Sequence, residues 1–438
     1  MGTSAPWHLR VHDPLAAGRS LRRAGETASL LRPRCLVLSM TDTVRLATRG
    51  SDLALRQATQ IRDALSSRRR EVELVTVETR GDDIRDELIH RLGTTGAFVH
   101  ALDEEVVDGT VDAAVHSLKD IPTEDRDELA VAGVPQRAPA GDVLLTPDGL
   151  SLDELPEEAR VGTSSLRRRA QLLAARPDLT VVPLRGNVDT RIEKLLAPTL
   201  QSEHEARLEA AGGLPDADGN TNETDTDGDS ASPARDTSTQ TAGDGATGDG
   251  DGDGGGDSDD SAFEQSVEEW FDSLTELERE ALGRDVEEVY DGIVLAESGL
   301  RRSDLLDIPG SRRLERSQFV PAPGQGTIAV TACDPGITET IRTAVDHPRT
   351  RVETTAERTV LGELGGGCVA PMGVHAVMKG EYVHLRTRVQ SGDGSREVAD
   401  TRDLRVGEYA DEAAQFAADL ADRGAAELIA EAQEVADD

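Results

Sequence analysis

Short valine-rich segments alternate with amphipathic ones along most of the chain, and this alternation constrains the fold more than any other feature. Residues 43–48 and 71–78 have the composition of strands, and residues 53–65 between them have the spacing of an amphipathic helix. Strands alternating with helices predict an α/β fold. The further strand-like segments are residues 113–115, 129–134, 143–145, 160–161, 180–183 and 293–296.

The alternation stops after Leu196. Residues 197–261 consist mainly of Gly, Asp, Ser and Thr, and residues 248–260 contain almost no apolar side chain. Such a segment cannot bury enough surface to offset the entropy of ordering, so we expect residues 197–282 to form an acidic and mostly disordered insertion. Only residues 263–282 have apolar side chains at roughly helical spacing, which could form a short helix. From Arg351 onward we expect two strands and then one helix over residues 409–434.

Acidic residues outnumber basic ones 84 to 47, which gives a net charge of -37. This charge argues against binding to nucleic acid or to anionic lipid. Lysine occurs only at Lys119, Lys194 and Lys379, and aromatic residues make up 2% of the chain. The composition is typical of a salt-adapted protein, because an acidic and well-hydrated surface stays soluble in concentrated salt. The repulsion between its charges is then mostly screened, since the Debye length is only ~3 Å at 1 M. A generically acidic soluble protein is the alternative.

The cysteines are Cys35, Cys333 and Cys368, an odd and widely spaced set that matches neither a disulfide framework nor a metal site. No apolar run is long enough to span a bilayer, so we predict a soluble cytoplasmic protein without a metal. Residues 1–39 are basic and could be a weak targeting segment. We favour the alternative that translation begins at Met40, because the basic stretch differs in composition from everything that follows.

A strand-like segment that begins at Ala114 ends in Lys119 and Asp120, just before Pro122. Polar residues at the carboxyl end of such a strand lie where α/β folds build their sites. An ordinary solvated ion pair remains the alternative.

Two glycine-containing turns then precede arginine-rich helix starts. Residues 161–169 form the first, and residues 184–191 the second. Backbone N–H groups, hydroxyls and a helix dipole converge at such turns and favour an anion. The alternative for the first turn is simple N-capping by Ser164 or Ser165 with a solvated arginine face. Two such turns in an acidic chain predict a positive basin for a polyanionic ligand.

Two further glycine motifs occur towards the C-terminus. Gly324–Gly326 predicts a sharp turn, which alone is weak evidence for a site. Gly365–Gly367 precedes Cys368 and predicts an exposed loop with a reactive thiol, although an incidental cysteine is equally compatible with the residues alone. Cys333 resembles a small buried hydrophobic residue.

Together with residues 47–51 and 79–82, these motifs resemble porphobilinogen deaminases in order and spacing, from Val44 to the C-terminus apart from the insertion. The resemblance implies two α/β lobes with mixed sheets, similar to periplasmic binding proteins, with a cleft between them, and a small α+β domain at the C-terminus. The implied bounds are residues 40–137 and 327–345 for the first lobe, 138–196 and 283–322 for the second, and 349–438 for the third domain, with residues 1–39 as an extension.

The resemblance also implies an activity: stepwise deamination and condensation of four porphobilinogen molecules into hydroxymethylbilane, primed on a covalently bound dipyrromethane. Asp120 would be the catalytic carboxylate and Cys368 would carry the dipyrromethane through a thioether. Arginine suits the rows of carboxylates on these molecules, because its planar fork binds a carboxylate bidentately. We expect a monomer. The implied cofactor-binding residues are Cys368, Lys119, Asp120, Thr163, Ser164, Ser165, Arg167, Arg168 and Arg185, and the implied substrate-binding residues are Arg49, Ser51, Phe98, Arg185, Arg191 and Gln325.

The sequence departs from the family pattern at Thr95, where many members carry a cation in a loop that includes the retained Phe98. Two rival functions use the same motifs. A solute-binding module would explain two lobes and anion-binding turns but leaves Cys368 unexplained. A thiol hydrolase using Cys368 and His375 lacks a nucleophile motif around the cysteine.

Overall fold

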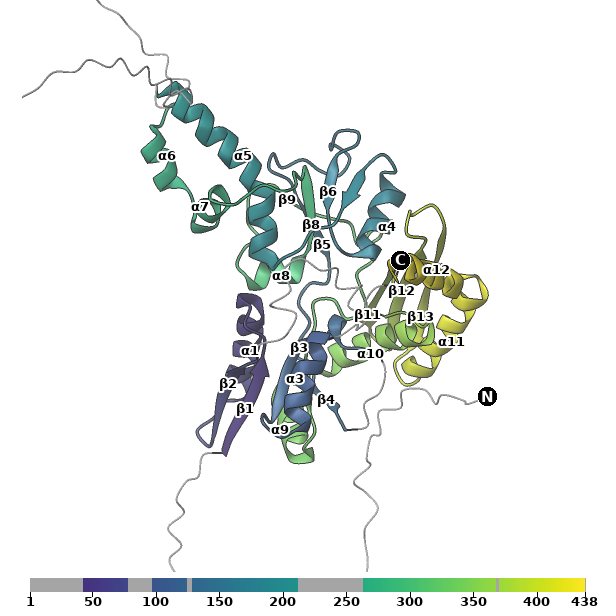
Figure 1. Ribbon diagram of the computed structural model, residues 1–438. Coiled ribbons are helices and arrows are strands. Elements are labelled where there is room, and N and C mark those ends of the chain that lie inside the picture. The colour runs from purple at the N-terminus through teal and green to yellow at the C-terminus, as the bar shows by residue number, and fades with distance from the viewer. Residues whose placement is uncertain (1–41, 78–96, 124–127, 212–262, 368–369, 438) are drawn as a thin grey trace, which may run out of the picture.

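The structure, a computed structural model, describes residues 42–77, 97–123, 128–211, 263–367 and 370–437. The extension, Met40, Thr95, Cys35 and Cys368 lie outside the described residues. The described chain contains two five-stranded sheets and one three-stranded sheet, each with its own helices (Figure 1). The predicted mixed α/β fold is confirmed. No described helix combines the length and the low polarity that crossing a bilayer requires.

The first sheet has the order β2-β1-β3-β10-β4. Strands β2, β1 and β3 run parallel, whereas β10 is antiparallel to both of its neighbours. Buried side chains such as Leu46, Ile61 and Val330 form its core. The strands and helices of this unit are β1 (Asp42–Thr48), α1 (Asp52–Leu65), β2 (Arg70–Thr76), α3 (Ala97–Val107), β3 (Ala113–Ser117), β4 (Ala130–Gly133), β10 (Ile328–Ala332) and α9 (Pro335–Val345).

The second sheet repeats this arrangement with the order β7-β6-β8-β5-β9. Its first three strands are parallel, and β5 is antiparallel to β8 and β9. Its core includes Leu145, Ile192 and Ile293. Helix α8 contacts α1 of the first unit (Figure 1). The elements are β5 (Asp142–Leu145), β6 (Arg160–Gly162), α4 (Leu166–Ala175), β7 (Thr180–Val182), α5 (Val188–Ala210), β8 (Gly292–Ala296), α8 (Glu297–Arg302) and β9 (Ser311–Arg313).

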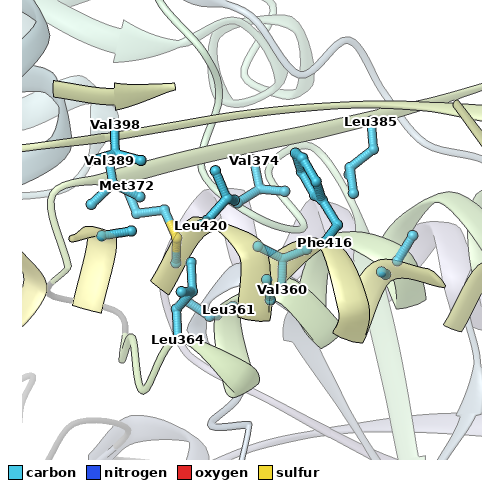
Figure 2. Close-up of a cluster of buried hydrophobic side chains, with 14 of the residues drawn as sticks. Val360, Leu361, Leu364, Met372, Val374, Leu385, Val389, Val398, Phe416 and Leu420 are labelled. Carbon is cyan, nitrogen blue, oxygen red and sulfur yellow. The ribbon is translucent and has the colours of Figure 1, made fainter. Parts of the chain in front are cut away.

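The third sheet is an antiparallel meander, β11 (Met372–Lys379), β12 (Tyr382–Gln390) and β13 (Glu397–Arg405). It packs on α10 (Pro348–Glu363), α11 (Tyr409–Asp422) and α12 (Ala425–Asp437). Figure 2 shows the shared core, in which Val360, Met372, Val374, Leu385 and Phe416 are buried.

The prediction of two strands and one helix in this region was wrong. Strand β13 was missed because it is mostly polar and buries only two of its nine side chains, Val398 and Leu404. The long helix is divided at Gly424, whose φ of +96° lies in the left-handed region that glycine adopts most readily.

The prediction that the polar insertion begins at residue 197 was also wrong. Helix α5 continues through Pro198 to Ala210 and packs against α6 (Val267–Ser273) and α7 (Glu276–Leu282) (Figure 1). Leu200, Trp270 and two further residues form a small buried cluster between these helices. The apolar side chains that stabilise the end of α5 come from about 70 positions further along the chain. A prediction from neighbouring residues could not show that they contact α5. Residues 212–262 lie outside the described residues.

Candidate active site

The turn that carries Lys119 and Asp120 follows β3, four of whose five residues are buried. Leu118–Asp120 form one turn of 3-10 helix, in which Leu118 is buried, Lys119 is half-buried and Asp120 is exposed. Because β1 and β3 are parallel, this turn lies at the same edge of the first sheet as Arg49 and Ser51, which follow β1 and are half-buried. The structure therefore places these four predicted residues at one sheet edge, as α/β sites require.

The Gly324–Gly326 turn packs directly on this segment. Gly324 has a φ of +73°, and a Cβ atom there would lie 3.3 Å from the backbone nitrogen of Lys119. The Leu118 N–H donates to the Thr327 carbonyl at 2.9 Å. Only glycine allows this approach, so the turn that was weak evidence in the sequence has a definite structural role.

Gln325, between those glycines, reaches into the second unit. Its side-chain Nε2 donates to the Ala140 carbonyl at 2.5 Å and to Asp142 Oδ1 at 3.0 Å. Its Oε1 accepts from Arg167 Nη2 at 3.3 Å. The side chain is 2% exposed. One turn therefore joins the backbone beside Asp120 to the arginines of the second unit.

Arg167 and Arg168 share a single buried carboxylate, Asp142. Arg167 Nη1 lies 2.8 Å from Asp142 Oδ2, and Arg168 Nη2 lies 2.8 Å from Asp142 Oδ1. Burial alone would raise the pKa of Asp142, but the charges of both arginines and hydrogen bonds from Arg167 and Gln325 outweigh it and lower the pKa to about 2. Asp142 was not singled out in the sequence. The available signal was an aspartate opening the otherwise apolar strand 142–145.

The N-capping alternative for the 161–169 turn is correct for the cap but not for the arginines. Ser165 caps α4 by accepting from the Arg168 N–H, and Thr163 Oγ1 accepts from the Ser165 N–H at 3.2 Å. The arginine face is not solvated, however, because Arg167 and Arg168 are 3% and 6% exposed.

The second turn lies beside the first. Ser164 Oγ donates to the Leu184 carbonyl at 2.6 Å and accepts from the Leu184 N–H at 3.1 Å. Arg185 follows and is half-buried. Arg191 Nε donates to the Gly186 carbonyl at 2.8 Å, and burial together with the charge of Arg168 lowers the pKa of Arg191 to about 10. The contribution of Arg168 shows that the two guanidiniums are close enough for their charges to interact.

Arg302 contacts the Gly324–Gly326 turn and was also missed in the sequence. Its Nη2 donates to the Gly326 carbonyl at 2.8 Å, and burial lowers its pKa to about 10. The sequence offered no signal, because Arg302 ends a short helix outside every motif singled out above. Two predicted residues cannot be placed in the site: Phe98 is the second residue of α3, and its side chain lies outside the described residues, as does Cys368.

Comparisons with known proteins identify the family of this chain. The family model for the porphobilinogen deaminase dipyromethane cofactor binding domain matches residues 44–236 and 279–337, and the model for the porphobilinogen deaminase C-terminal domain matches residues 352–425. A solved periplasmic sulfonate-binding protein from Methylobacillus flagellatus covers 73% of this chain and 67% of its own at 10% identity with a TM-score of 0.30, which is too low to support an argument.

The matches with two named relatives cover nearly the whole length of each relative. A probable porphobilinogen deaminase of Halobacterium salinarum is 52% identical over 89% of this chain and 98% of its own. The porphobilinogen deaminase of Thermobifida fusca is 33% identical over 90% of this chain and 97% of its own. The salt-adapted composition of this chain agrees with its similarity to a protein of Halobacterium salinarum. The chain belongs to the porphobilinogen deaminase family.

Proposed function

We propose that this chain carries out the reaction of its family with Asp120 as the catalytic carboxylate and Cys368 as the attachment point of the dipyrromethane. Porphobilinogen deaminases are transferases that build hydroxymethylbilane from four porphobilinogen molecules for tetrapyrrole biosynthesis. The observation that carries the assignment is the Gly324–Gly326 turn, which packs on the backbone beside Asp120 and hydrogen-bonds Arg167 and Asp142 through Gln325.

The residues suit a dipyrromethane, whose acetate and propionate groups are anionic. Arg167 and Arg168 are two cations that share one carboxylate, and Arg191 is close enough to Arg168 for its pKa to be lowered. This excess of positive charge would be balanced by ligand carboxylates. When bound, the dipyrromethane supplies the pyrrole to which the first substrate is joined.

The chain's own residues then have distinct tasks. Lys119, Arg167, Arg168 and Arg185, with Thr163, Ser164 and Ser165 as neutral partners, would hold cofactor carboxylates. Arg49, Ser51, Arg185, Arg191 and Gln325, with Phe98, would hold the substrate. Asp120 is exposed at the end of a buried strand, where its carboxylate can stabilise the positive charge that develops on the substrate pyrrole as ammonia leaves.

We also propose that the chain acts as a cytoplasmic monomer and that its three sheets mark the three domains. Their bounds are those given above, except that the second domain continues through α5 to Ala210. The net charge of -37 supports a monomer where salt does not screen it, because like charges oppose self-association. Sedimentation equilibrium in concentrated salt would give the mass of one chain, and a dimer mass would contradict the proposal.

Asp120→Asn tests the catalytic assignment. The substitution keeps the shape of the side chain and removes its charge, so single-turnover condensation should fall on the order of a hundredfold while the midpoint of thermal unfolding changes little. Intact mass should show one dipyrromethane per chain, and peptide mass mapping should place it at Cys368. Asp108→Asn, an exposed carboxylate of the same unit, is the control and should keep full turnover. Near-normal turnover in Asp120→Asn would remove Asp120 from the mechanism.

A further inference from the structure

Helix α10 of the third unit contacts the Asp120 turn through one arginine. The Arg358 guanidinium is half-buried and donates to three backbone carbonyls: through Nη1 to Leu118 at 3.3 Å and Ile121 at 2.8 Å, and through Nη2 to Pro122 at 2.6 Å. These three carbonyls lie on both sides of Asp120 in the sequence. Within the turn, the Ile121 N–H donates to the Leu118 carbonyl at 3.3 Å.

The preceding residue of α10 fixes the other side of the same segment. Glu357 is fully buried and accepts from the Gly324 N–H at 2.7 Å, the Ala376 N–H at 2.7 Å and Arg137 Nη1 at 2.6 Å. Burial alone would raise the pKa of Glu357, but the charge of Arg137 and the contact with His375 lower it to about 2. Glu357 therefore anchors the Gly324 turn, and Arg358 anchors the Asp120 turn that packs against it.

Arginine is suited to this contact for a geometric reason. A planar guanidinium presents several donors in a fixed fork, so one side chain can fix the relative positions of several carbonyls. A lysine ammonium is a compact charge on a flexible stem and cannot hold the same three acceptors in one plane.

We propose that Arg358 is a positioning residue for the reaction, which holds the backbone of residues 118–122 so that the Asp120 carboxylate stays where charge develops on the substrate. The inference rests on the proposed role of Asp120. The carbonyls that Arg358 holds belong to Leu118, Ile121 and Pro122, which flank Asp120, so its effect on the reaction would pass through the position of Asp120. It also couples the turn to the helix that precedes the Gly365–Gly367 loop.

The test is a double-mutant cycle on dipyrromethane-loaded enzyme in concentrated salt. Arg358→Ala should lower kcat by on the order of a hundredfold, since a displacement of about 1 Å costs that much, and leave the KM for porphobilinogen nearly unchanged. In the Asp120→Asn background, Arg358→Ala should cause little further loss, because the group it positions is already disabled. Arg342→Ala is the control: Arg342 lies on the surface of α9, 4.0 Å from the exposed Glu339, and should tolerate substitution.

The outcomes separate this inference from the proposed function. Independent, multiplicative losses in the double variant, or full turnover in Arg358→Ala, would overturn the positioning role while leaving Asp120 catalytic. Normal turnover in Asp120→Asn would reject both. If Arg358→Ala does not fold, Arg358→Lys replaces it, since lysine keeps the charge and the stem and should still lose turnover. Loss of folding in both variants would make Arg358 structural and contradict the proposal.

Discussion

At the scale of single residues, this site depends on charges buried in small, shared groups. Asp142 forms ion pairs with two arginines. Glu357 forms an ion pair with Arg137 and accepts hydrogen bonds from two backbone amides. A buried carboxylate is stable only when its partners offset the loss of hydration. Removing one member therefore leaves the others uncompensated, and the cost should greatly exceed that of losing a surface ion pair.

Asp142→Asn should lower the free energy of unfolding at neutral pH by about 3 kcal/mol, because both buried guanidiniums lose their counter-charge. The effect should depend on pH. The pKa of Asp142 is about 2 in the folded chain against an ordinary value of 3.8, so its ionised form stabilises the fold fully above about pH 4. That contribution is lost as pH falls from 3.8 towards 2.

The difference in stability between the native chain and Asp142→Asn should therefore narrow in acid by about 2 kcal/mol. Urea unfolding of both chains at pH 7, 5, 3 and 2 measures it. Asp108→Asn, at an exposed position, should show neither the loss nor the narrowing. A difference that stays constant or widens in acid would contradict the assigned pairing.

At the scale of elements, helices α5, α6 and α7 form a projection from the second unit (Figure 1). Leu200, Trp270, Leu274 and Ala281 are buried between them, His204 stacks on Trp270 with ring centroids 5.8 Å apart, and the guanidinium of Arg207 lies 5.1 Å from the Trp270 ring. The polar sequence that follows α5 therefore begins after a packed helix, not within the body of the second unit.

Two deletions should distinguish these parts. Replacing residues 212–262 by a short linker should leave turnover in concentrated salt unchanged, because this stretch has almost no apolar side chains to contribute to a core. Removing residues 197–282 also takes away the Leu200–Trp270 cluster and should lower the midpoint of thermal unfolding. Circular dichroism and single-turnover rates measure both. Loss of turnover in the shorter deletion with the fold intact would assign residues 212–262 a part in the reaction.

At the scale of the whole molecule, the dominant quantity is the net charge of -37. In dilute salt the acidic side chains repel one another over about 10 Å. In 1 M salt this repulsion is screened beyond ~3 Å. Lowering the salt concentration from several molar to about 0.1 M should therefore lower the midpoint of thermal unfolding. Sucrose at matched osmolality is the control and should not substitute for salt. A midpoint that is independent of salt would contradict the salt-adapted interpretation.

The sequence alone determined the α/β class and the motifs that brought the family into view, because strand and helix periodicity and glycine turns are local properties. It placed Lys119, Asp120, Arg167, Arg168, Arg185 and Arg191 at the ends of elements where the structure also has them. Even the buried strand before Asp120 followed from a few neighbouring residues.

Only the tertiary structure decided which distant groups meet. Asp142 with Arg167 and Arg168, Glu357 with Arg137, and Arg358 with the carbonyls around Asp120 join residues that are 25 to 240 positions apart. The missed strand β13 and the extended α5 have the same origin, since their apolar partners come from other elements. The local sequence pattern shows which residues favour a strand, a helix or a turn. Burial of a charge depends instead on how distant segments pack together, and neighbouring residues do not indicate which segments these are.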